Sequence, residues 1–253
     1  MKKLCTFLAA LTLALGAPAQ SFDRSSSDIF SLELTDWLEF NPLSYIYVGM
    51  QGPAAESGNG QVPRYTDHTS FGRSVEFGFN LAELVIRPYT TGAIGLGANL
   101  NWNYFNLFSD YLWIPYNNGT NVTIMDKMFL EHAPTIKSIK KSTLSVMSFD
   151  FPLNFTQYIG PFSITLGATA KINLAGRHRF RGVDSEGNEM NMRKSGIYFS
   201  KDIKTNLFTC DIHAALAYGG LGLYVKYKPM AVLSGPSPEF AVWTIGLILG
   251  LDM

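Results

Sequence analysis

Six side chains of this sequence have the chemistry for acid–base work or for ion pairing. They share one parity within segments of alternating polarity and are Glu76, Asp150, Lys171, Asp211, His213 and Lys226. Because alternate residues of a strand point to the same face, Asp211 and His213 could form an acid–base pair. The alternative is a polar plug, in which both charge signs satisfy each other inside a narrow barrel. No G-x-S-x-G motif or Ser-His-Asp order accompanies them, which favours the plug and a protein without catalytic residues.

The segments that hold these residues alternate apolar and polar positions with a period of two. In residues 162–174, for example, Ile164 and Leu166 alternate with Thr165 and Gly167. This period is typical of a strand with one apolar face. We expect eight strands, at Tyr45–Met50, Ser74–Arg87, Ala93–Tyr104, Ser142–Gln157, Phe162–Leu174, Phe208–Tyr218, Leu221–Lys228 and Ala241–Leu251.

Two of these strands change phase along their length. In Ser74–Arg87 the apolar parity switches before Leu84, and in Ser142–Gln157 it switches near Met147. An extra residue in one strand shifts the alternation in this way, so we expect a β-bulge in each.

The connections between the strands alternate in length. Short turns at 88–92, 158–161 and 219–220 separate long connections at 52–73, 107–141, 175–205 and 229–239. Transmembrane β-barrels have short periplasmic turns and long outer loops. The pattern therefore predicts an all-β fold: an eight-stranded antiparallel up-and-down transmembrane barrel with structureless outer loops.

Composition agrees with a barrel. Charged residues make up 16% of the chain, against roughly 25% in an average soluble protein. Aromatic residues fall near the ends of the apolar faces, where they would form girdles at the membrane interfaces. The expected girdle is Trp102, Tyr104, Phe155, Phe162, Phe208, Tyr218, Tyr227 and Trp243.

The first residues have the pattern of an export signal. Lys2 and Lys3 precede a short apolar run and an Ala17-Pro18-Ala19 cleavage motif. We expect residues 1–19 to be a signal peptide for the Sec pathway, 20–43 a periplasmic segment and 44–253 the barrel. Residues 21–42 could form a short amphipathic helix or an extended plug.

Charge and ligand chemistry exclude several classes of partner. Lys and Arg total 20, as do Asp and Glu, so the net charge is zero and a nucleic-acid partner is not expected. The four histidines lack metal-site spacing, so we expect no metal and no cofactor.

One basic group sits where an outer loop would meet the membrane, and the guanidinium group of arginine binds phosphate bidentately. We list its members as candidate lipopolysaccharide contacts: Lys137, Lys140, Lys141, Arg177, Arg179 and Arg181. The alternative is an ordinary solvated loop rim.

Several segments resemble the PorT-like outer-membrane β-barrel family of Gram-negative bacteria. The resemblance rests on the strand 148–155 with its Phe151-Pro152-Leu153, on the Gly-Ala-rich 166–170 and on the closing strand 244–251. It implies an outer-membrane barrel of the cell envelope, inserted by the barrel-assembly machinery, without shared enzymatic activity. The chain departs from the usual pattern in ending on Met253 instead of an aromatic residue.

Three functions are compatible with such a barrel. The first is a structural or interaction barrel whose outer loops contact lipopolysaccharide or an extracellular partner. The second is a small transport or secretion-accessory component, as some PorT relatives are. The third, and least favoured, is a barrel enzyme that acts on lipids.

Overall fold

The computed structural model describes residues 32–35, 38–57, 72–106, 111–116, 121–126, 137–183, 186–197, 205–232 and 239–250. The expected signal peptide lies outside these ranges. The strands are β1 (Leu32–Thr35), β2 (Leu38–Pro42), β3 (Tyr45–Ser57), β4 (Ser74–Tyr89), β5 (Gly92–Asn106), β6 (Tyr111–Tyr116), β7 (Asn121–Asp126), β8 (Ser138–Ile159), β9 (Phe162–Val183), β10 (Glu189–Ile197), β11 (Phe208–Tyr218), β12 (Leu221–Lys228) and β13 (Glu239–Gly250). Within the described ranges no helix is long and apolar enough to cross a membrane.

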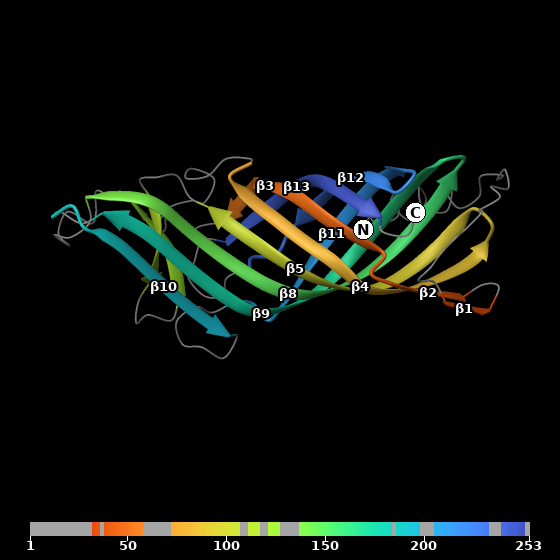
Figure 1. Cartoon of the computed structure of the whole chain (residues 1–253), viewed down its shortest axis with the longest axis horizontal. Coiled ribbons are helices and arrows are strands. Elements are labelled where there is room, and N and C mark those ends of the chain that lie inside the picture. Colours follow the sequence, from red (N-terminus) through yellow and green to blue (C-terminus); the bar gives the residue numbers. More distant parts are fainter. Residues whose placement is uncertain are drawn as a thin grey trace.

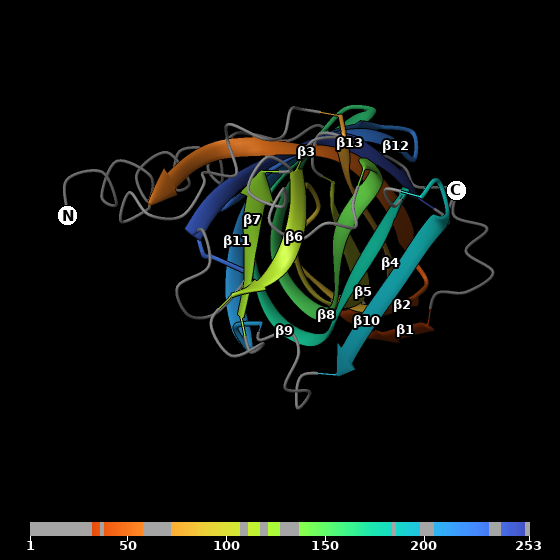
Figure 2. The same cartoon turned by 90° about the vertical axis from the view of Figure 1, so that its left-hand side faces the viewer.

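Eight of the described strands close into a ring (Figures 1 and 2). Each pairs antiparallel with the next, in the order β3, β4, β5, β8, β9, β11, β12, β13 and back to β3. They correspond to the eight predicted segments, so the antiparallel up-and-down architecture is confirmed. The β11–β12 turn shows how local sequence supports it. Gly219 and Gly220 have φ values of 51° and 82° there, and two positive φ values suit a two-residue hairpin turn.

Of the two predicted β-bulges, the one in β4 is present, because the pairing of β4 with β5 shifts between Asn80 and Ala82. The bulge expected in β8 near Met147 is wrong, because the even-numbered residues of β8 from Ser142 to Asn154 all face inward and the apolar pattern changes only because Leu144 and Val146 are apolar residues of the inner face. The pairing of β8 with β9 does shift at this level, but the extra residue is Leu174 of β9. Each shift moves the following side chains to the other face of the wall. The second one decides which side chains of β9 face outward at the long-loop end.

Two of the long connections are not structureless, so that expectation was wrong. Residues 107–141 include the β6–β7 hairpin, and residues 175–205 include the end of β9 and all of β10. The nine residues of β10 pair with β9 from Val183 to Ala175. Beyond the apolar belt neither face of a strand contacts lipid, so the residues of these strands do not alternate between apolar and polar. Backbone pairing with a neighbour specifies them instead.

The described part of the expected periplasmic segment is also strand, not helix. β2 pairs with residues 82–86 of β4, next to the part of β4 that pairs with β3. Leu43, with a φ of 56°, marks the break between β2 and β3. Arg87 on β4 forms a 2.6 Å salt bridge with Glu39 on β2. The β1–β2 pair thus extends the wall at the short-turn end (Figure 1).

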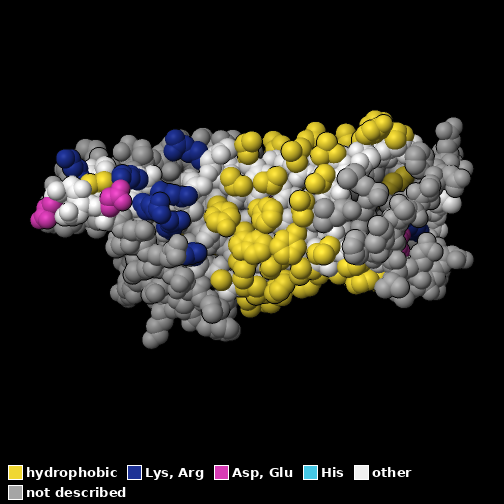
Figure 3. Space-filling view, in the orientation of Figure 1, with side chains coloured by type: hydrophobic (Ala, Val, Ile, Leu, Met, Phe, Trp, Pro, Cys, Tyr) yellow, Lys and Arg dark blue, Asp and Glu magenta, His cyan; other side chains and the backbone are white. Residues whose placement is uncertain are grey.

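The wall has its polarity reversed relative to a soluble protein. Large apolar side chains such as Ile212, Leu223 and Ile245 are exposed, while charged and amide side chains are buried inside. Figure 3 shows the apolar side chains as a broad band across the middle of the face in view. Inside the ring at the long-loop end lies a small apolar layer, in which Phe105 is opposite Leu144 in the β5–β8 register.

Candidate functional site

A layer of buried ion pairs crosses the lumen. The Lys171 Nζ lies 2.9 Å from an Asp211 carboxylate oxygen and 3.3 Å from one of Asp150. Glu76, which has no exposed surface, accepts a hydrogen bond from Lys226 at 2.8 Å, and its other carboxylate oxygen lies 3.2 Å from the Lys228 Nζ in a salt bridge. Three acids therefore meet three lysines, from β4, β8, β9, β11 and β12. We call these six residues the charged layer.

Amide side chains complete the charged layer. Asn101 donates to Glu76 at 2.9 Å and to Asp150 at 3.0 Å, so it joins the two groups of ion pairs. Gln51 donates to Asn103 at 3.1 Å, and Lys228 donates to Asn103 at 2.5 Å. Buried charges are tolerated only when pairing and hydrogen bonding compensate the loss of water. Both kinds of compensation are present in the charged layer. Because its side chains are almost fully buried, they fill the lumen at this level.

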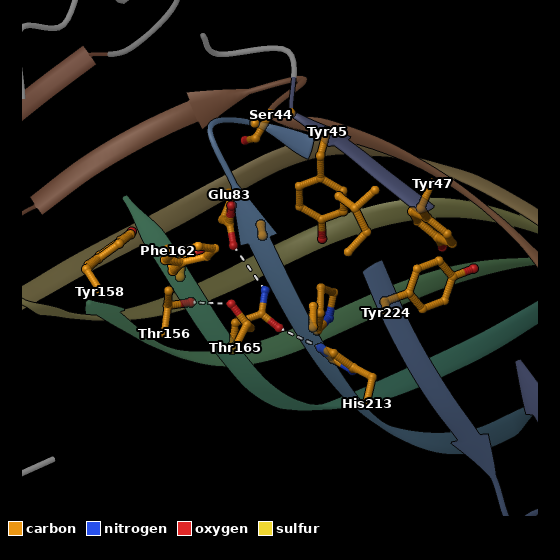
Figure 4. A pocket seen from close by; sticks show the side chains of 18 of the residues that line it. Ser44, Tyr45, Tyr47, Glu83, Thr156, Tyr158, Phe162, Thr165, His213 and Tyr224 are labelled. Carbon is orange, nitrogen blue, oxygen red and sulfur yellow. Dashed lines mark hydrogen bonds between the residues drawn. The ribbon is translucent and has the colours of Figure 1, made fainter. Parts of the chain in front are cut away.

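On the short-turn side of the charged layer the lumen is hollow. A cavity of about 510 Å³, which we call the chamber, opens toward the β4–β5, β8–β9 and β11–β12 turns (Figure 4). One wall carries polar groups of β4, β8 and β9, among them Glu83, Asn154 and Thr165. The rest of the lining includes small residues of β11 and β13, among them Ala215, which is paired with Thr165 of β9, and Gly250.

His213 belongs to the chamber and not to the charged layer. A ring nitrogen lies 2.9 Å from the Asn154 carbonyl oxygen, and Asn154 donates to Glu83 at 3.1 Å (Figure 4). The other ring nitrogen lies 3.3 Å from the Thr169 hydroxyl. Asp211 bonds Lys171 instead. Asp211 and His213 therefore take part in separate interactions, and no bond between them links an acid to a base.

The structure places all six predicted lumen residues on the inner face, five of them in the charged layer. Sequence reasoning missed Lys228, although it shares the parity of Lys226 two residues earlier. It also missed Glu83, because the bulge in β4 moves this residue onto the inner face. Glycine makes room for large inward groups: a Cβ at Gly167 would overlap the His213 ring, which lies opposite it in the β9–β11 register.

The basic residues of β8 and β9 divide into two groups. On β9 the buried parity changes from Lys171 and Asn173 to Gly176 and Gly182. The bulge against β8 causes this change, and it puts three arginines on the outward parity, of which Arg177 and Arg181 are exposed and Arg179 is half-buried. With the facing lysine of β8 they form what we call the basic face: Lys141, Arg177, Arg179 and Arg181. Figure 3 shows Lys and Arg side chains gathered beside the apolar belt toward β10.

The other two predicted contacts are not members of the basic face. Lys140 donates to Glu189 on β10 at 2.6 Å, and this hydrogen bond, with a smaller contribution from Arg181, lowers the pKa of the Glu189 carboxyl. Lys137 is exposed at the long-loop end of the barrel, where its backbone N–H donates to the Val183 carbonyl oxygen at 2.8 Å.

The predicted girdle residues are distributed as neighbouring pairs and single exposed rings. Phe162 and Tyr218, next to the short turns, have ring centroids 5.1 Å apart. Toward the long-loop end, the Tyr227 and Trp243 centroids are 4.7 Å apart, and Trp102 stacks on Phe77 at 6.1 Å. The remaining members are Tyr104 and Phe208, which are exposed, and Phe155, which is half-buried.

No group of three or more His, Cys, Asp or Glu in the described ranges is arranged to hold a metal. Cys210, on β11, is a free and exposed thiol.

The fold and lumen together define an up-and-down β-barrel with an apolar outside and a charged inside. The chain matches no known protein family and no curated protein. Among solved structures it resembles Ail, the attachment invasion locus protein of Yersinia pestis in complex with the heparin analogue sucrose octasulfate. Identity to Ail is 9%, over 82% of this chain and 97% of that chain, with a TM-score of 0.30.

It also resembles the P. putida toluene transporter TodX, with 11% identity over 88% of this chain and 58% of TodX, and a TM-score of 0.31. A third likeness is LpxR from Salmonella typhimurium, with 9% identity over 87% of this chain and 86% of that chain, and a TM-score of 0.25. Likenesses at these scores carry no argument about function, which must come from the geometry of this chain.

Proposed function

We propose that the protein is an integral outer-membrane barrel, exported through the Sec pathway, whose basic face holds the phosphates of lipopolysaccharide. The reversed polarity supports the membrane location. Outward side chains such as Leu216 and Leu247 are about half exposed, whereas Asp211 is 2% exposed and Lys171 is 3% exposed. Only a surrounding lipid phase makes this distribution favourable, because in water the apolar belt would be uncompensated.

The position and charge of the basic face carry the ligand assignment. Lys141 is directly opposite Arg181 in the β8–β9 register, and like charges at such positions destabilise a sheet. An anion between them removes that repulsion. Arg177 and Arg181 are exposed on the same face of one strand, and guanidinium groups bind phosphate bidentately. The face begins where the apolar belt ends, the depth at which a lipid carries its phosphates.

Binding, not catalysis, is the role that this geometry favours. Asp211 and His213 are the pair that the sequence suggested for acid–base chemistry, but they do not bond each other. Asp211 accepts a hydrogen bond from Lys171, and His213 bonds Asn154. A PorT-like role in protein export remains a second proposal and rests on the resemblance of the sequence segments.

The experiment compares lipopolysaccharide binding by the purified barrel and by a variant without the arginines. The variant is Arg177→Gln, Arg179→Gln and Arg181→Gln combined, and the control is Arg73→Gln, an exposed charge at the same end of β4. Each charge-assisted hydrogen bond contributes about 1.5–3 kcal/mol, so we expect the triple variant to bind at least about tenfold more weakly. Affinity should fall with added salt and with enzymatic dephosphorylation of the lipopolysaccharide.

Equal binding by the triple variant and the wild type would contradict the ligand assignment. Binding that survives dephosphorylation would contradict it as well. If the protein failed to insert into liposomes and stayed soluble without detergent, the membrane location itself would be wrong.

A further inference from the structure

The basic face extends along β9 farther than a single layer of phosphates requires. Arg177 and Arg181 are exposed on the same face of this strand, four residues apart. At about 3.3 Å per residue, their Cα atoms are separated by about 13 Å along the strand. Because the strands of such barrels tilt by about 35–45°, Arg181 lies about 10 Å farther out along the barrel axis than Arg177.

The inner part of the basic face is next to the aromatic girdle. Ser145 of β8 pairs with Arg177 of β9 on one side and with Tyr104 of β5 on the other. Tyr104 is an exposed ring of the expected girdle, and aromatic rings of this kind lie at the level of the lipid headgroups. Arg177 is therefore placed to reach the phosphate that a lipid carries next to its acyl chains.

The outer part of the basic face lies beyond the girdle. Arg181 is opposite Lys141 of β8, and at this level β8 is no longer flanked by β5, which ends at Asn106 opposite Thr143. The described bases of this outer end are Lys137, Lys140, Lys141 and Arg181, and the described acids are Glu186 and Glu189. Glu189 is engaged by Lys140 at 2.6 Å. Four bases against two acids leave positive charge in excess, at a level that the phosphate of a phospholipid does not reach.

Positive charge at two depths fits one class of lipid. A phospholipid carries its phosphate at a single level, whereas a lipopolysaccharide with a charged sugar core carries further anionic groups farther from the acyl chains. We propose that the basic face has two levels: Arg177 binds a phosphate of the lipid part, and Lys141 with Arg181 binds an anionic group of the sugar core. This inference rests on the proposed function and names the ligand class, a lipopolysaccharide with a phosphorylated core. Guanidinium groups at both levels supply the bidentate hydrogen bonds that phosphate accepts.

Calorimetry on the full chain in detergent tests the two levels with three probes: lipopolysaccharide with a phosphorylated core, lipid A and phosphatidylglycerol. The matched pair of variants is Arg177→Gln and Arg181→Gln, which remove the same charge from exposed positions of one strand. We expect Arg177→Gln to weaken the binding of lipopolysaccharide and of lipid A, each by about tenfold. Arg181→Gln should weaken lipopolysaccharide by a similar factor and leave lipid A unchanged. The wild type should bind phosphatidylglycerol and lipid A more weakly than lipopolysaccharide.

Three results would overturn the two-level arrangement and leave the proposed function standing. They are equal weakening of lipid A and lipopolysaccharide by Arg181→Gln, unchanged lipopolysaccharide binding by that variant, and unchanged lipid A binding by Arg177→Gln. If the wild type bound none of the three lipids, the proposed function would fail and this inference with it. Should Arg181→Gln not fold, Lys141→Gln replaces it with the same expected result, because the two residues are register partners.

Discussion

The two halves of the lumen are built from the same eight strands, yet one is sealed and the other is hollow. In the sealed half, long charged side chains from several strands meet at the centre, as Lys171 does between Asp150 and Asp211. In the hollow half, the inward residues of β11 are Ala215 and Ala217, which are too small to fill the space beside the polar groups of β4, β8 and β9. The number of strands therefore limits the width of a barrel, while the inward side chains decide whether it is open. Charge neutrality in the sealed half is what makes burial of six ionisable groups tolerable.

The largest difference between the two halves should appear in stability. Glu76→Leu leaves Lys226 and Lys228 buried without their carboxylate. Breaking a buried pair in this way costs about 3–5 kcal/mol. We expect the free energy of unfolding in liposomes, measured by urea titration, to fall by that amount. The control Ala217→Ser, in the chamber, should change it by less than about 0.5 kcal/mol. Comparable losses for both variants would mean that the ion pairs do not hold the sealed half together.

A somewhat smaller effect distinguishes the outer face from the inner face. Ala214 lies between outward-facing Leu166 and Val225 in the registers of β9 and β12. An arginine on a barrel's lipid face costs about 2–4 kcal/mol at the middle of the membrane. Ala214→Arg should lower the unfolding free energy by this amount, and Ala217→Arg, whose side chain can reach the mouth of the chamber, should cost less. If Ala217→Arg lowered the unfolding free energy more than Ala214→Arg, the assignment of the outward and inward faces of β11 would be wrong.

The smallest expected signal is electrical. Because the charged layer blocks the lumen, the wild-type protein should give no stable conductance in planar bilayers. The double variant Glu76→Ser and Lys228→Ser removes one acid and one base, and Lys226 keeps its contacts with the two tyrosine rings. We expect small, brief openings from this variant and none from Ala217→Ser. Sustained large openings of the wild type would contradict the seal and would favour the transport function.

The sequence could predict the wall of the barrel but only part of its contents. Period-two alternation follows directly from a strand with one face toward lipid, so all eight strands were predictable, as was the bulge in β4 from residues such as Leu84. The change near Met147 was misread as a bulge in β8, because the inner face there is apolar and the extra residue is Leu174 of β9. The same alternation placed Glu76 and Lys171 on the inner face. It could not find β10 or the end of β9, because outside the apolar belt neither face needs a fixed polarity. Nor could it detect that β2 continues the wall beside β4, since that pairing depends on a break at Leu43.

By itself, then, the sequence determined which side of each strand is apolar, because successive residues of a strand alternate between apolar and polar types. The tertiary structure alone decided which inward side chains meet. Glu76 and Lys226 are 150 positions apart in the chain, and only ring closure brings them to 2.8 Å. The chamber has the same origin, because an empty volume belongs to no single strand. It exists where the inward residues of β11 and β13 are too small to fill the lumen beside the polar groups of β4, β8 and β9, which only ring closure brings together.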